Sequence, residues 1–141
     1  MKVRLHFKNL ILGVGAGLLS TIIFAGETDA AGQSSHYTQN GGEVHYNWGS
    51  GGPNGLKDNF TATFNQNKAL TAGDYFIQAL ADDGVRVEAD GNRLIDRYGY
   101  ANGRMDQALW LGVNDGAHTI KTDFIEYLNG AAVFSDIAKL D

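Results

Sequence analysis

After residue 31, apolar side chains nowhere keep the spacing of an amphipathic helix over several turns. The chain instead alternates apolar and polar residues in short stretches, as in residues 60–64 and 85–89, which is typical of half-buried β-strands. Residues 74–81 are apolar at nearly every position, as expected for a central strand that is covered on both faces. Turns rich in glycine and asparagine separate these stretches. The pattern predicts an all-β fold.

Further strands are expected at residues 93–98, 108–111, 118–127 and 132–137, and residues 85–98 read as a hairpin that turns at Asp90-Gly91-Asn92. About seven or eight short strands with such turns predict an antiparallel β-sandwich or a barrel-like sandwich. The chain has no cysteine, so no disulfide can stabilise it, and stability must come from a hydrophobic core.

The N-terminus has the layout of a secretory signal peptide. Lys2, Arg4 and Lys8 precede an uncharged apolar run at residues 10–24, and small residues follow up to a cleavage site expected after Ala30. The apolar run is shorter than the roughly 20 residues that a membrane-spanning helix needs, although an uncleaved anchor is the alternative. We therefore predict a secreted, extracellular protein with no membrane span after cleavage of the signal peptide.

Three segments follow from this division. Residues 1–30 are the predicted signal peptide, and the polar, glycine-rich residues 31–42 are expected to form a flexible lead-in. Residues 43–141 are expected to form one β-sandwich domain, because the roughly 110 residues left after cleavage of the signal peptide can bury enough surface for a single core.

The charge balance excludes one class of partner. The chain has 16 acidic residues against 11 Lys and Arg, a net charge of −5. Nucleic acids are bound mainly through Lys and Arg, so an acidic chain argues against them. Neutral partners or cations are compatible with this charge.

Two adjacent carboxylates are the strongest candidate for chemistry. Asp82 and Asp83 follow the apolar stretch and precede Gly84, which places them at the end of a strand. Neighbouring like charges repel, and a calcium ion, which takes carboxylate and carbonyl oxygens, is one reason to place them together. An ordinary polar turn explains the same three residues. Spacing alone leaves both interpretations open.

An ordered set of short motifs resembles a known family, the protective-antigen fourteen-kilodalton domain family, over residues 44–137. The motifs are, in order, Trp48-Gly49, Asn59-Phe60, Gly73-Asp74-Tyr75, Ala81-Asp82-Asp83-Gly84-Val85-Arg86-Val87, Asp90-Gly91, Gly116-Ala117-His118-Thr119-Ile120, Glu126-Tyr127 and Gly130-Ala131-Ala132.

This resemblance implies a β-sandwich or barrel of the kind found in secreted toxins, glycosidases, cell-wall hydrolases and adhesins. In the lectin members an adjacent Asp pair is joined by a cis peptide and binds calcium, which then chelates sugar hydroxyls. Asp82 and Asp83 match that pair. Asn129 falls where the lectins supply a further ligand from a late loop. The resemblance thus implies a calcium site formed by Asp82, Asp83 and Asn129.

Aromatic residues offer candidate sugar contacts. Tyr98 and Tyr100 flank Gly99 and precede a loop, so they can stack on a sugar ring or pack against the protein. Trp110 lies in an apolar stretch and is expected in the core. His45 and His118 are isolated, and with no cysteine or further histidine nearby they do not form a zinc site.

Catalysis is not expected. Glycoside hydrolysis needs two carboxyl groups placed across the scissile bond, and Glu126, the best single acid, matches a framework position of the family. The chain contains no Gly-x-Ser-x-Gly elbow and no catalytic cysteine. We therefore predict a non-catalytic, calcium-dependent carbohydrate-binding module for cell-wall polysaccharide or another extracellular glycan. The alternative is a structural or protein-interaction accessory domain in which Asp82 and Asp83 form only a turn.

Overall fold

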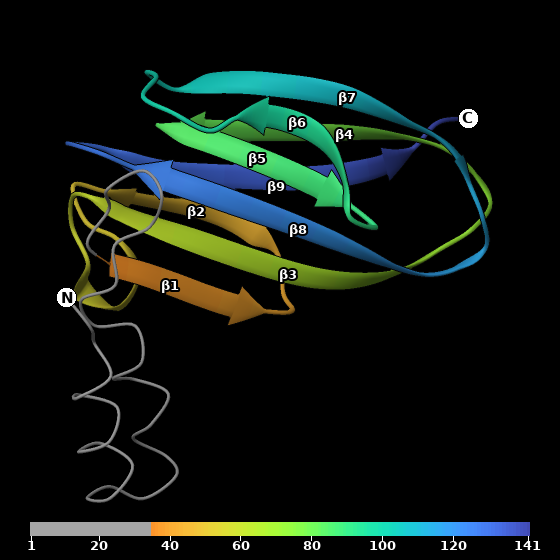
Figure 1. Ribbon diagram of the computed structural model, residues 1–141, viewed down its shortest axis with the longest axis horizontal. Helices are drawn as coiled ribbons and strands as arrows, with labels where there is room; N and C mark the ends of the chain where they lie inside the picture. Colours follow the sequence, from red (N-terminus) through yellow and green to blue (C-terminus); the bar gives the residue numbers. More distant parts are fainter. Residues whose placement is uncertain (1–34) are drawn as a thin grey trace, which may run out of the picture.

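The computed structural model describes residues 35–141, which form two β-sheets packed face to face (Figure 1). The five-stranded sheet has the order β1 (Ser35–Asn40), β3 (Phe60–Leu70), β8 (Gly116–Glu126), β5 (Gly84–Ala89), β6 (Asn92–Arg97). The four-stranded sheet has the order β2 (Val44–Gly49), β9 (Ala131–Lys139), β4 (Gly73–Asp82), β7 (Arg104–Val113). One short 3₁₀ turn, η1 (Pro53–Gly55), follows β2. The predicted all-β sandwich is confirmed.

One sequence prediction concerns residues outside this region. The predicted signal peptide falls on residues that the structure does not describe. Within residues 35–141 no helix is long and apolar enough to cross a membrane.

Strand β1 corrects the prediction for the N-terminal segment. Residues 35–40 were expected to belong to a flexible lead-in, but they pair with β3, and this pair is parallel whereas every other pair is antiparallel. His36 Nδ1 lies 2.6 Å from Thr61 Oγ1, and the Tyr37 ring packs edge-on against Phe64. Backbone pairing along an existing strand needs few apolar side chains, so the polar composition misled the prediction.

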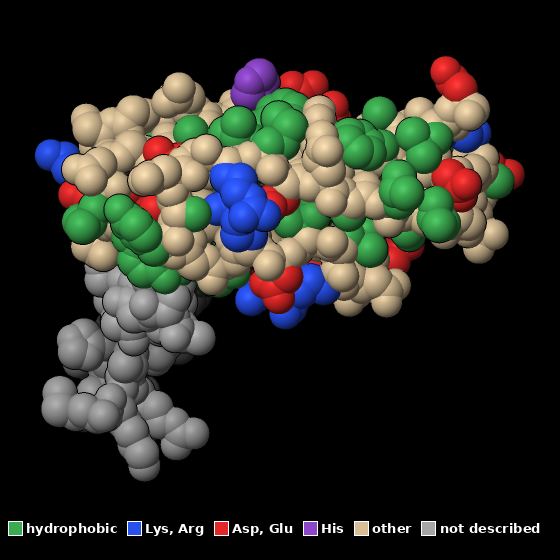
Figure 2. All heavy atoms as spheres, turned by 90° about the horizontal axis from the view of Figure 1, so that it is seen from above, with side chains coloured by type: hydrophobic (Ala, Val, Ile, Leu, Met, Phe, Trp, Pro, Cys, Tyr) green, Lys and Arg blue, Asp and Glu red, His purple; other side chains and the backbone are tan. Residues whose placement is uncertain are grey.

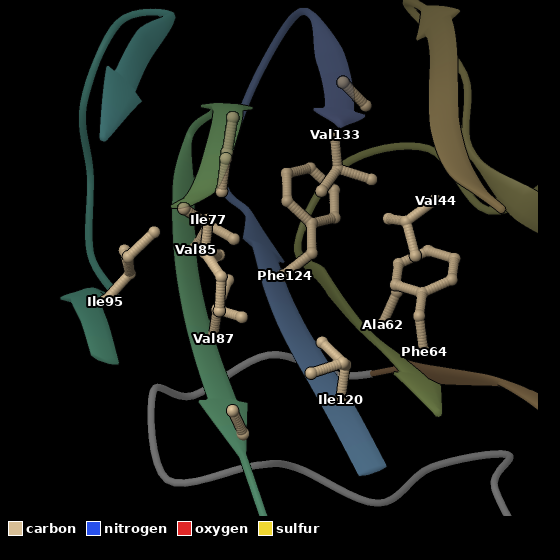
Figure 3. Close-up of a cluster of buried hydrophobic side chains, with 14 of the residues drawn as sticks. Val44, Ala62, Phe64, Ile77, Val85, Val87, Ile95, Ile120, Phe124 and Val133 are labelled. Carbon is tan, nitrogen blue, oxygen red and sulfur yellow. The ribbon is translucent and has the colours of Figure 1, made fainter. Parts of the chain in front are cut away.

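The core lies between the two sheets and is made of residues that alternate along their strands (Figure 3). β5 contributes Val85 and Val87, while β8 contributes Ile120 and Phe124, and each is at most 2% exposed. Trp110 is half-buried and packs against this cluster, as predicted. All fully buried members of the core come from residues 44–133, which lie within the predicted sandwich domain.

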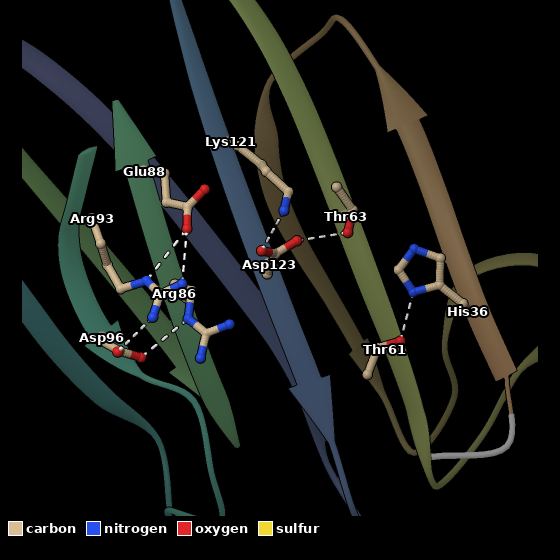
Figure 4. Close-up of polar contacts among 9 residues, drawn as sticks. All are labelled: His36, Thr61, Thr63, Arg86, Glu88, Arg93, Asp96, Lys121 and Asp123. Carbon is tan, nitrogen blue, oxygen red and sulfur yellow. Dashed lines mark hydrogen bonds and ion pairs between the residues drawn. The ribbon is translucent and has the colours of Figure 1, made fainter. Parts of the chain in front are cut away.

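The outer face of the five-stranded sheet is polar (Figure 4). Arg93 forms ion pairs with Glu88 at 3.1 Å and with Asp96 at 3.2 Å, and Arg86 pairs with Asp96 at 3.1 Å. On β8 the Asp123 carboxylate accepts a hydrogen bond from Thr63 Oγ1. This face therefore suits contact with water.

Two glycines allow the β4–β5 junction to approach the segment after β6. A Cβ atom placed on Gly84 would lie 2.4 Å from Gly99 N and 2.8 Å from Ile125 Cγ2, whereas a Cβ on Gly99 would meet nothing within 4 Å. The backbone at Gly99 thus fills the space in which a residue at position 84 would carry its side chain.

We predict that Gly84→Ala destabilises the protein by about 1–3 kcal/mol, because the new methyl group overpacks against backbone. Gly99→Ala is the matched control and should change the free energy of unfolding by less than about 0.5 kcal/mol. Urea unfolding monitored by tryptophan fluorescence measures both values. Equal effects of the two substitutions would contradict the close approach.

Candidate functional site

The predicted Asp pair lies where β4 ends and β5 begins. β4 ends at Asp82, β5 begins at Gly84, and the peptide bond between Asp82 and Asp83 is cis, as the family resemblance implies. Asp83 is 2% exposed, whereas Asp82 is partly exposed. One carboxylate is therefore enclosed by the protein and the other reaches solvent.

Backbone donors hold the Asp83 carboxylate at both of its oxygens. Ala101 N donates to Oδ1 at 3.3 Å, and Tyr127 N donates to Oδ2 at 2.8 Å. Ala101 belongs to the β6–β7 connection, and Tyr127 directly follows β8. Because a buried carboxylate requires hydrogen bonds, these two amides fix Asp83 and in turn the loops that carry them.

Arg97, at the end of β6, braces the same junction. Its Nη1 donates to the carbonyl oxygen of Asp83 at 2.8 Å, and its Nη2 donates to the carbonyl oxygen of Ala81 at 3.3 Å. Nη2 also donates to the carbonyl oxygen of Arg104 at 3.1 Å, and Nε pairs with the Asp106 carboxylate of β7. The guanidinium thus holds the carbonyls on both sides of Asp82 in one planar arrangement of donors.

A third carboxyl group lies behind the pair. Glu126 is fully buried at the end of β8 and lies next to Asp83. Burial, together with the charges of Asp83, Asp82 and Asp58, raises the pKa of Glu126 to about 8. Glu126 is therefore protonated at neutral pH when no cation is nearby.

The loop after β8 lies against Asp82. A Cβ atom on Gly130 would come within 3.4 Å of Asp82 Oδ2. Asn129 has φ +79°, and its backbone N–H donates to Asp58 Oδ1 at 3.0 Å. Burial and the neighbouring Asp83 raise the pKa of Asp82, while Arg97 and a backbone hydrogen bond from Gly103 oppose the rise. The structure therefore brings the Asn129–Gly130 loop next to the Asp pair.

The donors at this junction fit a hard cation in type. Carboxylates, an asparagine side chain and backbone carbonyls are the ligands that calcium takes, and the crowding of carboxyl groups here favours a positive ion. Within residues 35–141, however, no group of three or more His, Cys, Asp or Glu side chains is arranged to hold a metal. A calcium ion would therefore rest on Asp82 and Asp83 and would need Asn129 or backbone oxygens as well.

The two candidate tyrosines differ in their surroundings. Tyr100 is 68% exposed, and its ring contacts that of Tyr127 edge-on at 6.1 Å. It directly precedes Ala101, whose amide binds Asp83. The ring of Tyr98 is half-buried, with the Arg86 guanidinium 4.6 Å from its centre. The structure thus places Tyr100 beside the Asp pair and Tyr98 against Arg86.

The histidines have structural surroundings, as expected. His118 Nδ1 lies 2.6 Å from Asp90 Oδ2, and Nε2 lies 2.9 Å from the carbonyl oxygen of Asn114. These partners raise the pKa of His118, with the Asp90 hydrogen bond as the main cause. His45 lies at the surface with its ring edge-on to Phe134.

Sequence reasoning missed Arg97 and assigned Glu126 only to the framework. Arg97 gave no signal, because an arginine that ends an alternating strand is usually a solvated side chain. Glu126 did give one, since a lone acid at the end of an apolar stretch indicates a buried carboxyl group.

The protonation of Glu126 predicts a pH dependence. In the absence of calcium, the free energy of unfolding should fall as pH rises from 4.5, the ordinary pKa of the group, to about 8, because ionising Glu126 costs more in the folded chain. Glu126→Gln, which mimics the protonated form, should flatten this decline. Urea unfolding with EDTA at pH 5, 6.5 and 8 makes the comparison, and parallel curves for the two proteins would contradict the assignment.

The hydrogen bonds of Arg97 are expected to stabilise the β4–β5 junction. Arg97→Lys cannot donate to all the carbonyls that Arg97 holds, so it should lower the free energy of unfolding by about 1.5–3 kcal/mol. Arg93→Lys alters an exposed ion pair on the polar face and should cost less than about 1 kcal/mol. Thermal unfolding of both variants checks this. An Arg97→Lys protein as stable as the Arg93→Lys protein would contradict the stabilising role of Arg97.

Comparison with known proteins finds solved structures that have a similar fold. No protein-family model and no curated protein matches the chain. Among solved structures, an anti-sigma factor domain-containing protein aligns with a TM-score of 0.64 and 20% identity over 69% of this chain. The PA14 domain of the antifreeze protein MpAFP aligns with a TM-score of 0.58 and 13% identity, covering 69% of this chain and 63% of that one.

A PA14 sugar-binding domain from an RTX adhesin aligns with a TM-score of 0.56 and 17% identity, covering 70% of this chain and 68% of that one. The chain spans about a third of the anti-sigma factor domain-containing protein, of which 35% is covered. These likenesses show that the fold is related to that of PA14 domains.

Proposed function

We propose that this domain is a secreted, non-catalytic carbohydrate-binding module that works with calcium. The observation that carries the proposal is the junction between β4 and β5, where Asp82 reaches solvent beside a buried, doubly hydrogen-bonded Asp83 and against the loop that carries Asn129. Its fold is related to a PA14 domain that is described as sugar-binding.

Calcium would be held by Asp82 and Asp83, with Asn129 as the further side-chain ligand. When bound, the ion supplies a positive centre that accepts oxygen ligands and so can take sugar hydroxyls. Asp82 is the accessible carboxylate, and Asp83 is positioned by Ala101 N and Tyr127 N. Arg97 holds the carbonyls on either side of Asp82. These contacts set the geometry of the loop in advance, which limits the entropy lost on binding.

Tyr100 is the proposed aromatic contact for the sugar. Its ring is exposed, and Tyr127 supports it from one side. An aromatic face suits the C–H-rich face of a pyranose ring, while the hydroxyl stays in contact with water. Tyr98 is a weaker candidate than the sequence indicated, because Arg86 already lies over its ring.

The environment of Glu126 supports the absence of catalysis in this proposal. A pKa of about 8 would suit a general acid. Glu126 is 0% exposed, however, and a general acid must come within hydrogen-bond reach of the substrate. We therefore assign Glu126 to the support of the Asp82–Asp83 junction. The proposed ligand is a cell-wall polysaccharide or another extracellular glycan. The proposed location is outside the cell, because the predicted signal peptide would direct export.

A structural or protein-interaction domain is the second candidate. Both oxygens of Asp83 already accept backbone hydrogen bonds, so this residue could serve only to join two loops. In that case the junction would bind no cation, and the Asp pair would be a turn.

Calcium binding separates the two candidates. A ligand that binds only the folded protein stabilises it by about 2.7 kcal/mol at one hundred times Kd. We expect one calcium ion per chain by isothermal titration, a raised Tm in calcium and a return to the lower Tm in EDTA. Asp82→Asn should abolish both effects without unfolding the protein, because Asp82 is partly exposed.

Asp96→Asn is the matched control, since Asp96 lies on the polar face of the five-stranded sheet and should leave calcium binding unchanged. Retention on immobilised polysaccharides, in calcium and in EDTA, then tests the sugar. Absence of calcium binding at millimolar concentration would reject the calcium-dependent module. Calcium binding without retention on any glycan would keep the metal and reject the sugar.

A further inference from the structure

The β2–β3 connection, residues 50–59, lies at the same end of the sandwich as the junction between β4 and β5. Strand pairing places Phe60, the first residue of β3, opposite Glu126, the last residue of β8, and it places Gly84 of β5 opposite Ile125. Figure 1 shows the β2–β3, β4–β5 and β8–β9 connections at this end, on the left. Figure 2, seen from the side of β7, shows Asp and Glu side chains at the same end. The β2–β3 connection is therefore a neighbour of the candidate site.

Two hydrogen bonds join the β2–β3 connection to the loop after β8. Asn59 N donates to the carbonyl oxygen of Tyr127 at 3.1 Å, and Asn129 N donates to Asp58 Oδ1 at 3.0 Å. Tyr127 is also held through its own N–H, which donates to Asp83 Oδ2 at 2.8 Å. Asp58 thus adds a further point of attachment, two residues along the loop that leads to β9.

The loop that contains Asn129 depends on hydrogen bonds for its position. Leu128 is 55% exposed and Asn129 is exposed, so side-chain packing holds them weakly. Asn129 has φ +79°, a left-handed conformation that is unfavourable for most residues with a side chain and persists where the surroundings hold it. Gly130 follows directly, and a Cβ atom there would lie 3.4 Å from Asp82 Oδ2. The Asn129–Gly130 segment therefore links Asp58 to the accessible carboxylate of the Asp pair.

We propose that Asp58 is a positioning residue of the calcium site, and that its carboxylate holds the Asn129–Gly130 segment next to Asp82. This inference rests on the proposed function, in which Asn129 supplies the further side-chain ligand. Asp58 acts through Asn129 and is not itself a ligand. Loss of a residue that orients a metal ligand typically lowers metal affinity by about tenfold to a hundredfold. Asp58→Ala should therefore weaken calcium binding although it leaves all three proposed ligands in the chain.

The charge of Asp58 offers a competing explanation for such a loss. This charge contributes to the raised pKa of Glu126, so it acts on the same junction and would also attract a cation there. Asp58→Asn separates the two explanations, because it removes the charge but keeps a side-chain oxygen that can accept the Asn129 N–H. If Asp58 positions the loop, Asp58→Asn should bind calcium nearly as well as the unchanged protein does.

Calcium titration calorimetry compares the unchanged protein with these two variants and a matched control, Asp115→Ala. Asp115 Oδ1 likewise accepts a backbone hydrogen bond, from Ala72 N at 2.7 Å, but at the opposite end of β4. We expect Asp58→Ala to raise Kd at least about tenfold, Asp58→Asn to raise it less than about threefold, and Asp115→Ala to leave it unchanged. An Asp58→Ala protein with an unchanged Kd overturns the proposal. An Asp58→Asn protein as weak as Asp58→Ala also overturns it, since the charge would then be the cause.

Amide hydrogen exchange in EDTA tests the positioning without calcium. Asp58 is exposed, so Asp58→Ala should remain folded, with the Asn129 amide exchanging at least about tenfold faster and the Ala72 amide unchanged. Asp115→Ala should have the reverse effect. Equal exchange of the Asn129 amide in the unchanged and Asp58→Ala proteins overturns the proposal. Absence of calcium binding by the unchanged protein rejects the proposed function, and the role of Asp58 at a calcium site with it. Calcium binding that Asp58→Ala leaves intact rejects only the role of Asp58.

Discussion

The buried carboxylate of Asp83 joins segments that lie far apart along the chain. It accepts one hydrogen bond from the β6–β7 connection, at Ala101 N, and one from the residue after β8, at Tyr127 N. Arg97 adds hydrogen bonds to the carbonyls of Ala81 and Asp83. Without these partners a buried charge would be costly, so the loops around Asp82 take their positions from the carboxylate that they enclose. The exposed part of the site is thereby organised by its buried part.

The two sheets divide the surface of the molecule between them. The outer face of the five-stranded sheet carries ion pairs and suits water. The outer face of the four-stranded sheet carries Phe76 and Leu80, and Asp82 is the last outward residue of β4.

The strands and the position of the Asp pair could be predicted from the sequence, since alternation and turn residues report local structure directly. Prediction failed where the structure of a segment depends on the strand with which it pairs. Residues 35–40 lack an apolar pattern, yet they form β1 because β3 offers an edge. The stretch at residues 74–81 was expected to be covered on both faces, but β4 is covered by the core on one face only.

The proposed function depends on cation binding at the β4–β5 junction, and amide chemical shifts test this binding most directly. In a titration with calcium followed by ¹H–¹⁵N correlation spectra, the largest changes should fall on the amides that hold or border the Asp pair, those of Ala101, Gly103, Tyr127 and Gly130. Amides on the polar face, such as that of Asp96, should stay in place. Unchanged spectra at millimolar calcium, or changes centred elsewhere in the sandwich, would contradict the calcium site.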